Sequence, residues 1–391
     1  MASLPDFELF INGQKFTHFT RGFVRLSLEQ AASLFEFSYA DLRVDLTGPP
    51  PIEAGDRCTI KLQDRLLVTG FIDDVSTQYS AGELQLTARG RSTLGDLVDC
   101  SAHFKKGRWR DVTLRQIAQN LCSPFGIEVS VDPVGDYKKR FPRFAIDPGE
   151  SVLDCITRAA RLRGLFPASD PEGALRLLAA GERVLSNVAL EYGQNIIRGE
   201  RLDSHAGRHS AYFIKGQSPS DNESNGRTTA QENSAIFDDQ IVRYRPLLLV
   251  STSQKGKRDL KRRAVWERNR RAGQGERVIY TVDGFGYGEG FNREVWMPGV
   301  QVRIKDPRLA VDGTFLLIAC AYRFAADGNE GGRTTDLTFV QKAAFDLIET
   351  YPKRKRGRPL GDTSAPTLDE KTAQDRQHAD WNVVPPEGPL L

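Results

Sequence analysis

Two short stretches that lie far apart in the chain have similar sequences, and this repeat most constrains how the chain can fold. The first is AGDRCTIK at residues 54–61, and the second is PGVQVRIK at residues 298–305. Each copy leads into a strand that carries a glycine, Leu67–Ile72 or Gly313–Ile318. A later strand with a Leu-Thr pair follows in both, at Leu86-Thr87 and Leu337-Thr338. If the repeat is real, two related β-barrels flank a middle domain.

A glycine that turns into an alternating strand is common in β proteins, so the short match alone leaves chance similarity open. The sequence around the first copy does favour β-structure, because Asn12-Gly13 is a strong hairpin signal and Gly48–Pro51 and Ala81-Gly82 break the apolar runs. The strands expected there are Phe7–Ile11, Lys15–Phe19, Val24–Leu28, Leu34–Tyr39, Arg57–Leu62, Leu66–Val75 and Glu83–Ala88. Short strands at this spacing are typical of a barrel or sandwich.

The middle of the chain has helical periodicity. An apolar stripe predicts a short helix that begins near Glu150 or Ser151 and ends before Gly164. The stripe consists of Val152, Cys155, Ile156, Ala159 and Ala160. Strands Leu165–Ala168 and Ala174–Leu178 follow, joined by an SDPEG turn. An earlier helix, marked by Leu114, Ile117, Ala118 and Leu121, precedes a strand at Ile127–Val131, so a small α/β domain is expected.

The second half of the chain returns to strands, with two exceptions. Gln217–Ser234 is almost wholly polar and predicts an exposed mobile loop, and Lys255–Arg271 predicts a helix with nine Lys or Arg. We expect an α+β, mostly β chain. Its domains are a first barrel (1–101), the middle domain (102–182), a strand-rich connecting region (183–275), strands that complete a second barrel (276–345), and an extended tail (346–391).

Composition narrows the class of protein. Lys and Arg number 54 against 51 Asp and Glu, and the net charge of +3 is too small for nucleic-acid binding by bulk electrostatics. The longest apolar run, Phe315–Tyr322, is far shorter than the roughly 20 residues of a membrane span, and MASLPDFELF does not resemble a cleaved signal. The scattered cysteines are typical of core thiols from a reducing cytoplasm: Cys58, Cys100, Cys122, Cys155 and Cys320. We therefore expect a soluble protein.

Few residues have the spacing of a catalytic or metal site. His205 and His209 alone have ligand-like spacing, but no third Cys or His ligand lies nearby, so solvated loop histidines are favoured over a metal site. Gly90–Gly95 misses the nucleophile-elbow spacing by one residue. Gly256-Lys257 lacks the upstream glycine of a phosphate-binding loop.

The remaining candidates also have simpler interpretations. The alternating glycines of Gly284–Gly290 favour a flexible hairpin tip with two exposed aromatic residues. Asp73-Asp74 and Asp238-Asp239 are interpreted as surface turn residues at strand ends, rather than as a glycosidase-like carboxylate pair. We expect no catalytic residue, no metal ligand, no cofactor and no enzyme activity.

Two basic runs remain, Lys255–Arg271 and Lys353–Pro359. Cations packed this closely repel one another unless an acidic partner or a polyanion is near. Gly357-Arg358-Pro359 resembles the minor-groove hook of some chromatin proteins, but a basic anchor on a protein partner is favoured over DNA binding.

Five segments carry a resemblance to a known family. They are Ile52–Asp74, Asp147–Leu178, Tyr212–Ser220, Arg243–Trp266 and Trp296–Leu317. In this order they resemble the Mu-like tail protein P family, the baseplate hub proteins of contractile phage tails. That family is related to phage late control protein D and to the N-terminal part of type VI secretion spikes. The resemblance covers roughly residues 5–345.

This resemblance implies a homotrimer in which each chain gives two similar barrels to a ring, so that a three-fold spike can meet a six-fold tail tube. The implied partners are further copies of the chain, the central spike protein, the tail tube or distal tube-initiator protein, baseplate wedge proteins and the tape-measure protein. DNA would pass through the lumen on ejection. The protein would belong to the virion and be synthesised in the host cytoplasm. The middle domain resembles the LysM fold of some relatives, although Pro167 and the Arg-rich helix face leave sugar binding open.

The leading hypothesis is therefore a structural hub. One alternative is a peptidoglycan-binding or cell-wall-degrading tail protein that uses the middle domain. Another is a DNA-binding accessory protein that uses the two basic runs.

Overall fold

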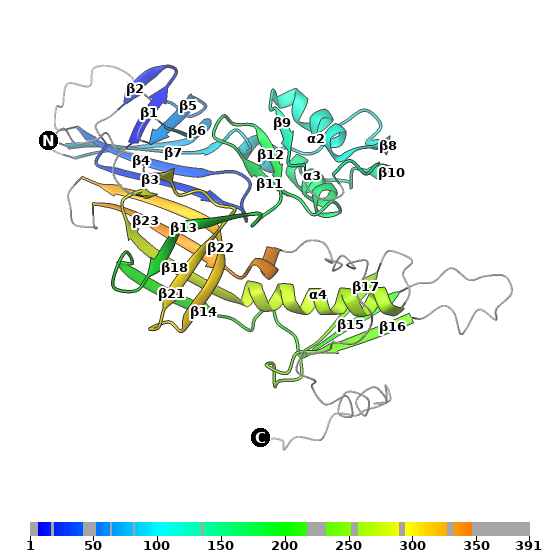
Figure 1. Cartoon of the computed structure of the whole chain (residues 1–391). Helices are drawn as coiled ribbons and strands as arrows, with labels where there is room; N and C mark the ends of the chain where they lie inside the picture. The colour runs from blue at the N-terminus through cyan, green and yellow to red at the C-terminus, as the bar shows by residue number, and fades with distance from the viewer. Residues whose placement is uncertain are drawn as a thin grey trace, which may run out of the picture. The chain divides into compact units, whose positions relative to one another are not determined.

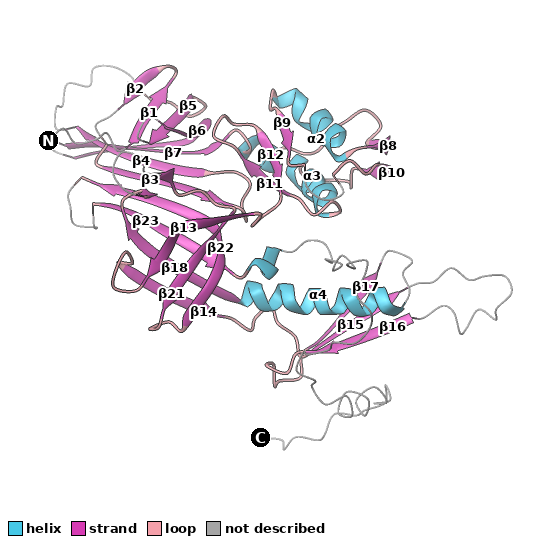
Figure 2. Cartoon of the chain, in the orientation of Figure 1, coloured by secondary structure: helices cyan, strands magenta, loops and turns pink. Residues whose placement is uncertain are grey.

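The computed structural model shows a mostly β chain, which confirms the expected class (Figure 1). It describes residues 7–16, 19–41, 52–62, 65–80, 83–133, 137–216, 232–251, 257–288, 294–326 and 332–345. Helices gather mainly in the middle of the chain and in one long helix, α4 (Lys257–Gly275) (Figure 2). The expected tail, 346–391, lies outside the described residues.

The N-terminal unit consists of seven strands. They are β1 (Phe7–Ile11), β2 (Gln14–Phe16), β3 (Arg21–Ser27), β4 (Leu34–Asp41), β5 (Arg57–Leu62), β6 (Arg65–Ser80) and β7 (Glu83–Ser92). Asn12 and Gly13 both have positive φ, 48° and 85°, as a tight hairpin turn requires. The predicted hairpin at Asn12-Gly13 is therefore confirmed.

The C-terminal unit is built from six main strands. They are β13 (Arg183–Glu191), β14 (Arg198–Asp203), β18 (Glu276–Asp283), β21 (Val300–Asp306), β22 (Val311–Ala325) and β23 (Arg333–Val340). A small hairpin of β19 (Gly286–Tyr287) and β20 (Glu294–Val295) follows β18.

The two units have the same strand order. The N-terminal unit runs β3-β4-β7-β6-β5-β1, and the C-terminal unit runs β14-β18-β23-β22-β21-β13. Five of the six strands also match in direction. The sixth differs, because β1 is antiparallel to β5 whereas β13 is parallel to β21. The β1–β2 hairpin reverses the chain before β3, whereas the chain passes directly from β13 to β14.

The sequence repeat corresponds to a repeated turn. Gly55 has φ +96° and donates its N–H to the carbonyl oxygen of Ile72 at 2.7 Å. Gly299 has φ +100° and donates to Leu317 at 2.8 Å. A β-bulge lies just after each acceptor, between Ile72 and Asp74 in β6 and after Leu317 in β22. Glycine recurs here because side-chain-bearing residues rarely adopt this backbone conformation.

A second glycine pair matches in the strand registers but not in any sequence motif. Gly22 of β3 lies opposite Phe37, and Gly199 of β14 lies opposite Tyr280 at the corresponding position. In each case the aromatic ring occupies the space in front of the glycine, where an added Cβ would come within 3.1 Å or less of the ring. The absence of a Cβ therefore leaves room for the ring.

The two Leu-Thr pairs lie in equivalent strands, β7 and β23, as expected, but their positions along these strands differ by two residues. At the bulges, Thr338 lies opposite Ala319 and its counterpart Arg89 lies opposite Asp74. Thr338 is thus equivalent to Arg89 rather than to Thr87. A two-residue offset keeps side chains on the same face of a strand, so the similar alternation concealed the difference.

One strand pair joins the two units into a single 13-stranded sheet. β22 pairs antiparallel with β3, from Ala319 opposite Ser27 to Ala325 opposite Arg21. Side chains of both units then share one hydrophobic core, in which Phe7 of β1 contacts Phe285 from the loop after β18. The described pairings form an open succession of strands, and closure of each unit into a barrel stays a prediction.

The middle unit is built around a second core of 23 buried residues, two of which, Ala31 and Ala32, come from the connection between β3 and β4. Its elements are α1 (Gly95–Asp99), β8 (Arg108–Val112), α2 (Leu114–Cys122), the 3-10 turn η1 (Ser123–Phe125), β9 (Val129–Val131), β10 (Phe141–Ala145), α3 (Val152–Arg161), β11 (Phe166–Ser169) and β12 (Leu175–Leu178). The predicted apolar stripe of α3 is fully buried, and Ser151 caps the helix by accepting the Asp154 N–H. The β11–β12 turn contacts the N-terminal unit, where Thr69 and Thr93 donate to the carbonyl oxygens of Pro171 and Gly173.

A three-stranded module is inserted between β14 and β18. Its strands are β15 (Ala211–Gly216), β16 (Glu232–Phe237) and β17 (Pro246–Ser251), in the order β16-β15-β17, and α4 packs on them (Figure 1). Most of the predicted mobile loop, 217–231, lies outside the described residues. Its last part was wrong, because residues 232–234 pair with β15 as the start of β16. Helix α4 extends beyond the predicted Arg271 to Gly275, and the 3-10 turn η3 (Lys342–Phe345) lies against it at Gly273.

Replacing Gly55 or Gly299 by alanine is expected to lower the free energy of unfolding by about 1–2 kcal/mol each, because a Cβ disfavours positive φ. Neither added Cβ would meet another atom within 4 Å, so the cost arises in the backbone alone. Urea unfolding followed by circular dichroism measures the change. Gly207→Ala is the control, since Gly207 has open space and no left-handed φ. Variants as stable as this control would contradict a required glycine turn.

Candidate interaction site

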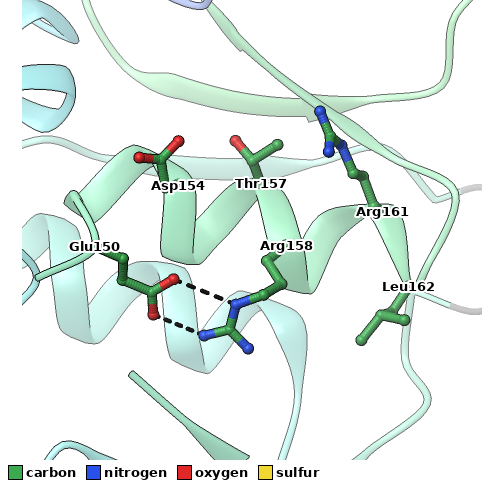
Figure 3. A pocket seen from close by; sticks show the side chains of 6 residues that line it. All are labelled: Glu150, Asp154, Thr157, Arg158, Arg161 and Leu162. Carbon is green, nitrogen blue, oxygen red and sulfur yellow. Dashed lines mark hydrogen bonds and ion pairs between the residues drawn. The ribbon is translucent and has the colours of Figure 1, made fainter. Parts of the chain in front are cut away.

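A shallow hollow of about 440 Å³ lies along the exposed face of α3 (Figure 3). It is lined by Glu150, Asp154, Thr157, Arg158, Arg161 and Leu162. These residues share one side of the helix because they are three or four positions apart, opposite the buried stripe that faces the core. The hollow is thus a direct product of the amphipathic helix that the sequence predicts.

An ion pair occupies the centre of this hollow. The Arg158 guanidinium donates to both carboxylate oxygens of Glu150, at 2.7 and 3.3 Å, and also lies 3.3 Å from Asp147. Its other side packs over the Phe144 ring. Burial alone would raise the pKa of Glu150, but the Arg158 and Asp147 hydrogen bonds outweigh it and hold that pKa below its ordinary value. The charge of Arg158 is therefore balanced by carboxylates of the same chain, whereas Arg161, at the edge of the hollow, has no described ion pair.

A second, polar hollow of about 480 Å³ lies where β14, α4 and η3 meet. Among its lining residues, Arg208 makes a buried two-pronged ion pair with Asp238, with contacts of 2.8–3.2 Å. Arg201 pairs with Asp203 and Glu276 and donates to the carbonyl oxygen of Leu309. The Arg208 pair lies within the inserted segment and the Arg201 pairs lie within the sheet, so each arginine already has a carboxylate partner.

The two candidate metal-binding histidines, His205 and His209, have different surroundings. His205 lines the polar hollow, whereas His209 packs edge-on against Tyr212 and donates its backbone N–H to the Tyr212 hydroxyl. Burial and the nearby cations Arg271 and Arg245 hold the pKa of His209 below its ordinary value. Within the described ranges, no cluster of three His, Cys, Asp or Glu side chains could hold a metal ion.

The two acidic pairs are not both at strand ends. Asp73 and Asp74 lie within β6 at the bulge, where Asp73 accepts a hydrogen bond from Arg91 Nε at 2.6 Å, so that expectation was wrong. The sequence hid this position because β6 continues to Ser80, well beyond the predicted Val75. Asp238 follows the end of β16 as expected, but it is buried against Arg208, so its interpretation as a surface residue was wrong.

The expected exposed aromatic residues at Gly284–Gly290 are also corrected. Phe285 is only 2% exposed and packs in the main core, while Tyr287 packs on Trp296 and donates to Glu294 at 2.7 Å. These rings pack against residues that are distant in the sequence, and the local sequence pattern does not show such contacts. Residues 289–290 of this stretch lie outside the described part. Gly90, from the rejected elbow motif, lies in β7, where a Cβ would clash with Phe71 and Phe35.

Three arginines of the basic run in α4 interact with the protein itself. Arg271 pairs with Glu267 one turn earlier at 2.8 Å, Arg268 donates to the carbonyl oxygen of Phe237, and Arg270 lies over the Trp266 ring. This end of the run therefore stabilises the module rather than a partner. Residues 255–256 and the second run, Lys353–Pro359, lie outside the described residues. No described helix is both long and apolar enough to cross a membrane.

Three family models match successive parts of this chain. The Mu phage baseplate assembly protein GpP-like N-terminal model matches residues 6–92, the baseplate hub protein gp44-like second-domain model matches 94–179, and the GpP fourth-domain model matches 256–348. The chain is also 28% identical over 360 residues to the baseplate hub protein gp44 of Escherichia phage Mu, covering 88% of this chain and 90% of that protein. The chain belongs to the Mu-like baseplate hub family.

Solved structures agree with this hub family. The 43 kDa tail protein of prophage MuSo2 from Shewanella oneidensis has a TM-score of 0.75 and 27% identity, over 87% of this chain and 99% of that chain. The E. coli c3393 protein, a component of the type VI secretion system, has a TM-score of 0.52 and 12% identity, over 85% of this chain and 75% of that chain, which shows a shared fold. The predicted family is confirmed, and this hub protein is a baseplate component of a phage tail.

Arg158→Gln is expected to lower the free energy of unfolding at pH 7 by about 1 kcal/mol, because it removes a two-pronged pair to a mostly buried carboxylate. The pKa of Glu150 is depressed in the folded state, so the pair stabilises above the ordinary glutamate pKa and is lost as the pH falls through the folded value. The difference from wild type should shrink in acid. Thermal unfolding across pH measures it.

Arg161→Gln is the matched control. Arg161 lines the same hollow without a described ion pair, so its variant should change stability little at any pH. An Arg158→Gln effect that does not depend on pH would contradict the assigned role of Glu150.

Proposed function

We propose that three copies of this hub protein form a ring that joins a six-fold tail tube to a three-fold central spike. The observation that carries this proposal is the identical strand order of the two units within one chain. Two similar units in each of three chains give six similar units around one axis. Such a ring can present six-fold contacts on one side and three-fold contacts on the other.

The partners follow from that position. The ring would contact the central spike protein on one side and the tail tube or a distal tube-initiator protein on the other, with baseplate wedge proteins around it and the tape-measure protein above. DNA would pass through its lumen during ejection. The protein would be synthesised in the host cytoplasm and act within the virion.

The proposed domain division is the one expected from the sequence, with boundaries after residues 101, 182, 275 and 345. Support comes from the separate cores of the sheet and of the middle unit, although Leu94 and Leu97, which precede the first boundary, pack in the middle core. The connecting region contributes β13 and β14 to the C-terminal unit, and the inserted module of β15, β16, β17 and α4 projects from it.

Light scattering of the purified full-length chain is expected to give three times the 43.6 kDa mass of one chain. Electron microscopy of the same sample should show a ring of six similar lobes. A stable monomer that binds neither spike nor tube protein would contradict the proposal.

A hub without enzyme activity is expected neither to bind nor to cleave the cell wall. The hollow on α3 supports this, because its central arginine is paired with Glu150. Purified sacculi are incubated with the full chain, and both the bound protein and the released soluble fragments are measured. Lysozyme is the positive control for cleavage. Specific binding or release would favour the peptidoglycan alternative.

A further inference from the structure

Several edges of the long sheet have no strand partner among the described residues, and two of them are the counterparts of the edges that meet inside the chain. The first is the side of β6 away from β7, along Asp74–Ser80. The second is the outer side of β14, which pairs only with β18. An open edge presents unpaired N–H and C=O groups that favour pairing with another strand. Both edges are therefore candidate contact surfaces.

The junction inside the chain provides a template for the missing partner. In the matched strand order, β22 is the counterpart of β6, and β3 is the counterpart of β14. Within one chain β22 and β3 pair antiparallel along seven residues of each strand. The part of β22 that pairs with β3 begins just after the bulge, and the open part of β6 also begins just after its bulge.

We propose that β6 of one copy pairs antiparallel with β14 of the next copy and repeats the β22–β3 junction between chains. This inference rests on the proposed three-fold ring and names the surface that closes it. Three junctions between chains would then alternate with three equivalent junctions within chains. The contact is heterologous, with different edges meeting, and such contacts generate closed rings when the rotation fits.

The registers fix which residues would meet. The bulges align Asp74 with Ala319, so Ser76 is the counterpart of Ala321. The matched glycines Gly22 and Gly199 align Arg25 with Leu202. Ala321 lies directly opposite Arg25 within the chain. Ser76 of one copy is therefore expected opposite Leu202 of the next.

Exposed apolar side chains at the two edges support this register. Tyr79 is 88% exposed, whereas its counterpart Phe324 is half-buried against the core and lies opposite Gly22. In the proposed ladder Tyr79 lies opposite Gly199, the counterpart of Gly22. Pairing would cover Tyr79 as the internal junction covers Phe324. Leu202, itself 54% exposed, would also be covered.

Charged residues at the two edges do not oppose this register. Directly opposite pairs in the proposed ladder contain no two like charges. These pairs are Asp74 with Ser204, Val75 with Asp203, Ser76 with Leu202, Thr77 with Arg201, Gln78 with Glu200, Tyr79 with Gly199 and Ser80 with Arg198.

Backbone groups point in directions that suit the ladder. Ser204 donates its N–H to Gly275 in the direction of β18, so alternation turns the N–H of Arg201 toward the open edge. In the internal junction, Leu28 donates to Ile318 and Ala326 donates to Thr20, so alternation turns the N–H of Tyr322 toward β3. Thr77 is the counterpart of Tyr322, and its N–H is therefore expected to face the open edge of β6. Ser76 and Leu202 then form a non-hydrogen-bonded pair, with Cα atoms about 4.5 Å apart, which is within the range of a disulfide.

Disulfide cross-linking of the full-length chain tests this register. Ser76→Cys and Leu202→Cys are combined in a Cys100→Ser background, since Cys100 is exposed and the other four native cysteines are buried. Oxidation is expected to give covalent dimers and trimers, and no larger species, on non-reducing gels. A mixture of the two single variants should give dimers only, whereas either single variant alone should give none.

Two further cysteine pairs serve as controls. Arg25→Cys with Ala321→Cys should cross-link within one chain, which shows that this geometry accepts a disulfide. Thr77→Cys with Leu202→Cys should not cross-link, because a one-residue shift places the side chains on opposite faces. A trimer in which Ser76 and Leu202 fail to cross-link while the internal control succeeds would overturn the inference and leave the three-fold assembly intact. A chain that stays monomeric would overturn both.

A proline variant provides an independent measurement. Thr77→Pro removes an N–H that faces the open edge and should raise the concentration needed for assembly by about tenfold or more, since proline blocks pairing on that side. Thr77→Ala keeps the N–H and should assemble normally. Unchanged circular dichroism and melting of the dissociated chain would show that Thr77→Pro still folds. Unchanged assembly of Thr77→Pro would contradict the ladder.

Discussion

The antiparallel pairing of β22 with β3 is the contact on which the rest of this structure depends. It turns two units of six main strands each into one sheet with one shared core. It also uses one edge from each unit, β3 on one side and the far part of β22 on the other. The counterparts of those edges, β14 and the far part of β6, are left open as a consequence of the duplication. A protein built from two like units joined head to tail necessarily keeps one edge of each kind.

The insertions respect this sheet. The middle unit enters between β7 and β13, and the module of β15–β17 and α4 enters between β14 and β18, so neither interrupts a strand pair of the repeat. Each is held by specific polar contacts. Thr69 and Thr93 bind the β11–β12 turn, and the buried Arg208–Asp238 pair stabilises the base of the module. Added elements can therefore vary without altering the strand pairs of the sheet.

The described arginines serve mainly to fix the fold. Arg158, Arg208 and Arg271 each bind a carboxylate of the same chain, and two of these carboxylates, Asp238 and Glu267, are buried. A buried charge without a partner would be strongly destabilising, so these pairs are requirements of packing. The central arginines of both hollows are thus balanced by carboxylates of the same chain. It is consistent with a protein of a phage baseplate whose role is to make contacts.

The sequence by itself determined the local features that depend on only a few neighbouring residues. The Asn12-Gly13 hairpin, the buried stripe of α3 and the glycine turns at Gly55 and Gly299 follow from backbone preference and side-chain period, which act over a few residues. Tertiary structure alone decided the equivalence of Gly22 with Gly199, because the inserted module separates β14 from β18 and hides the spacing. It also decided the burial of Phe285, the length of β6 and the pairing of β22 with β3. These depend on which distant strands meet, and that is set by the summed packing of the whole core rather than by any one segment.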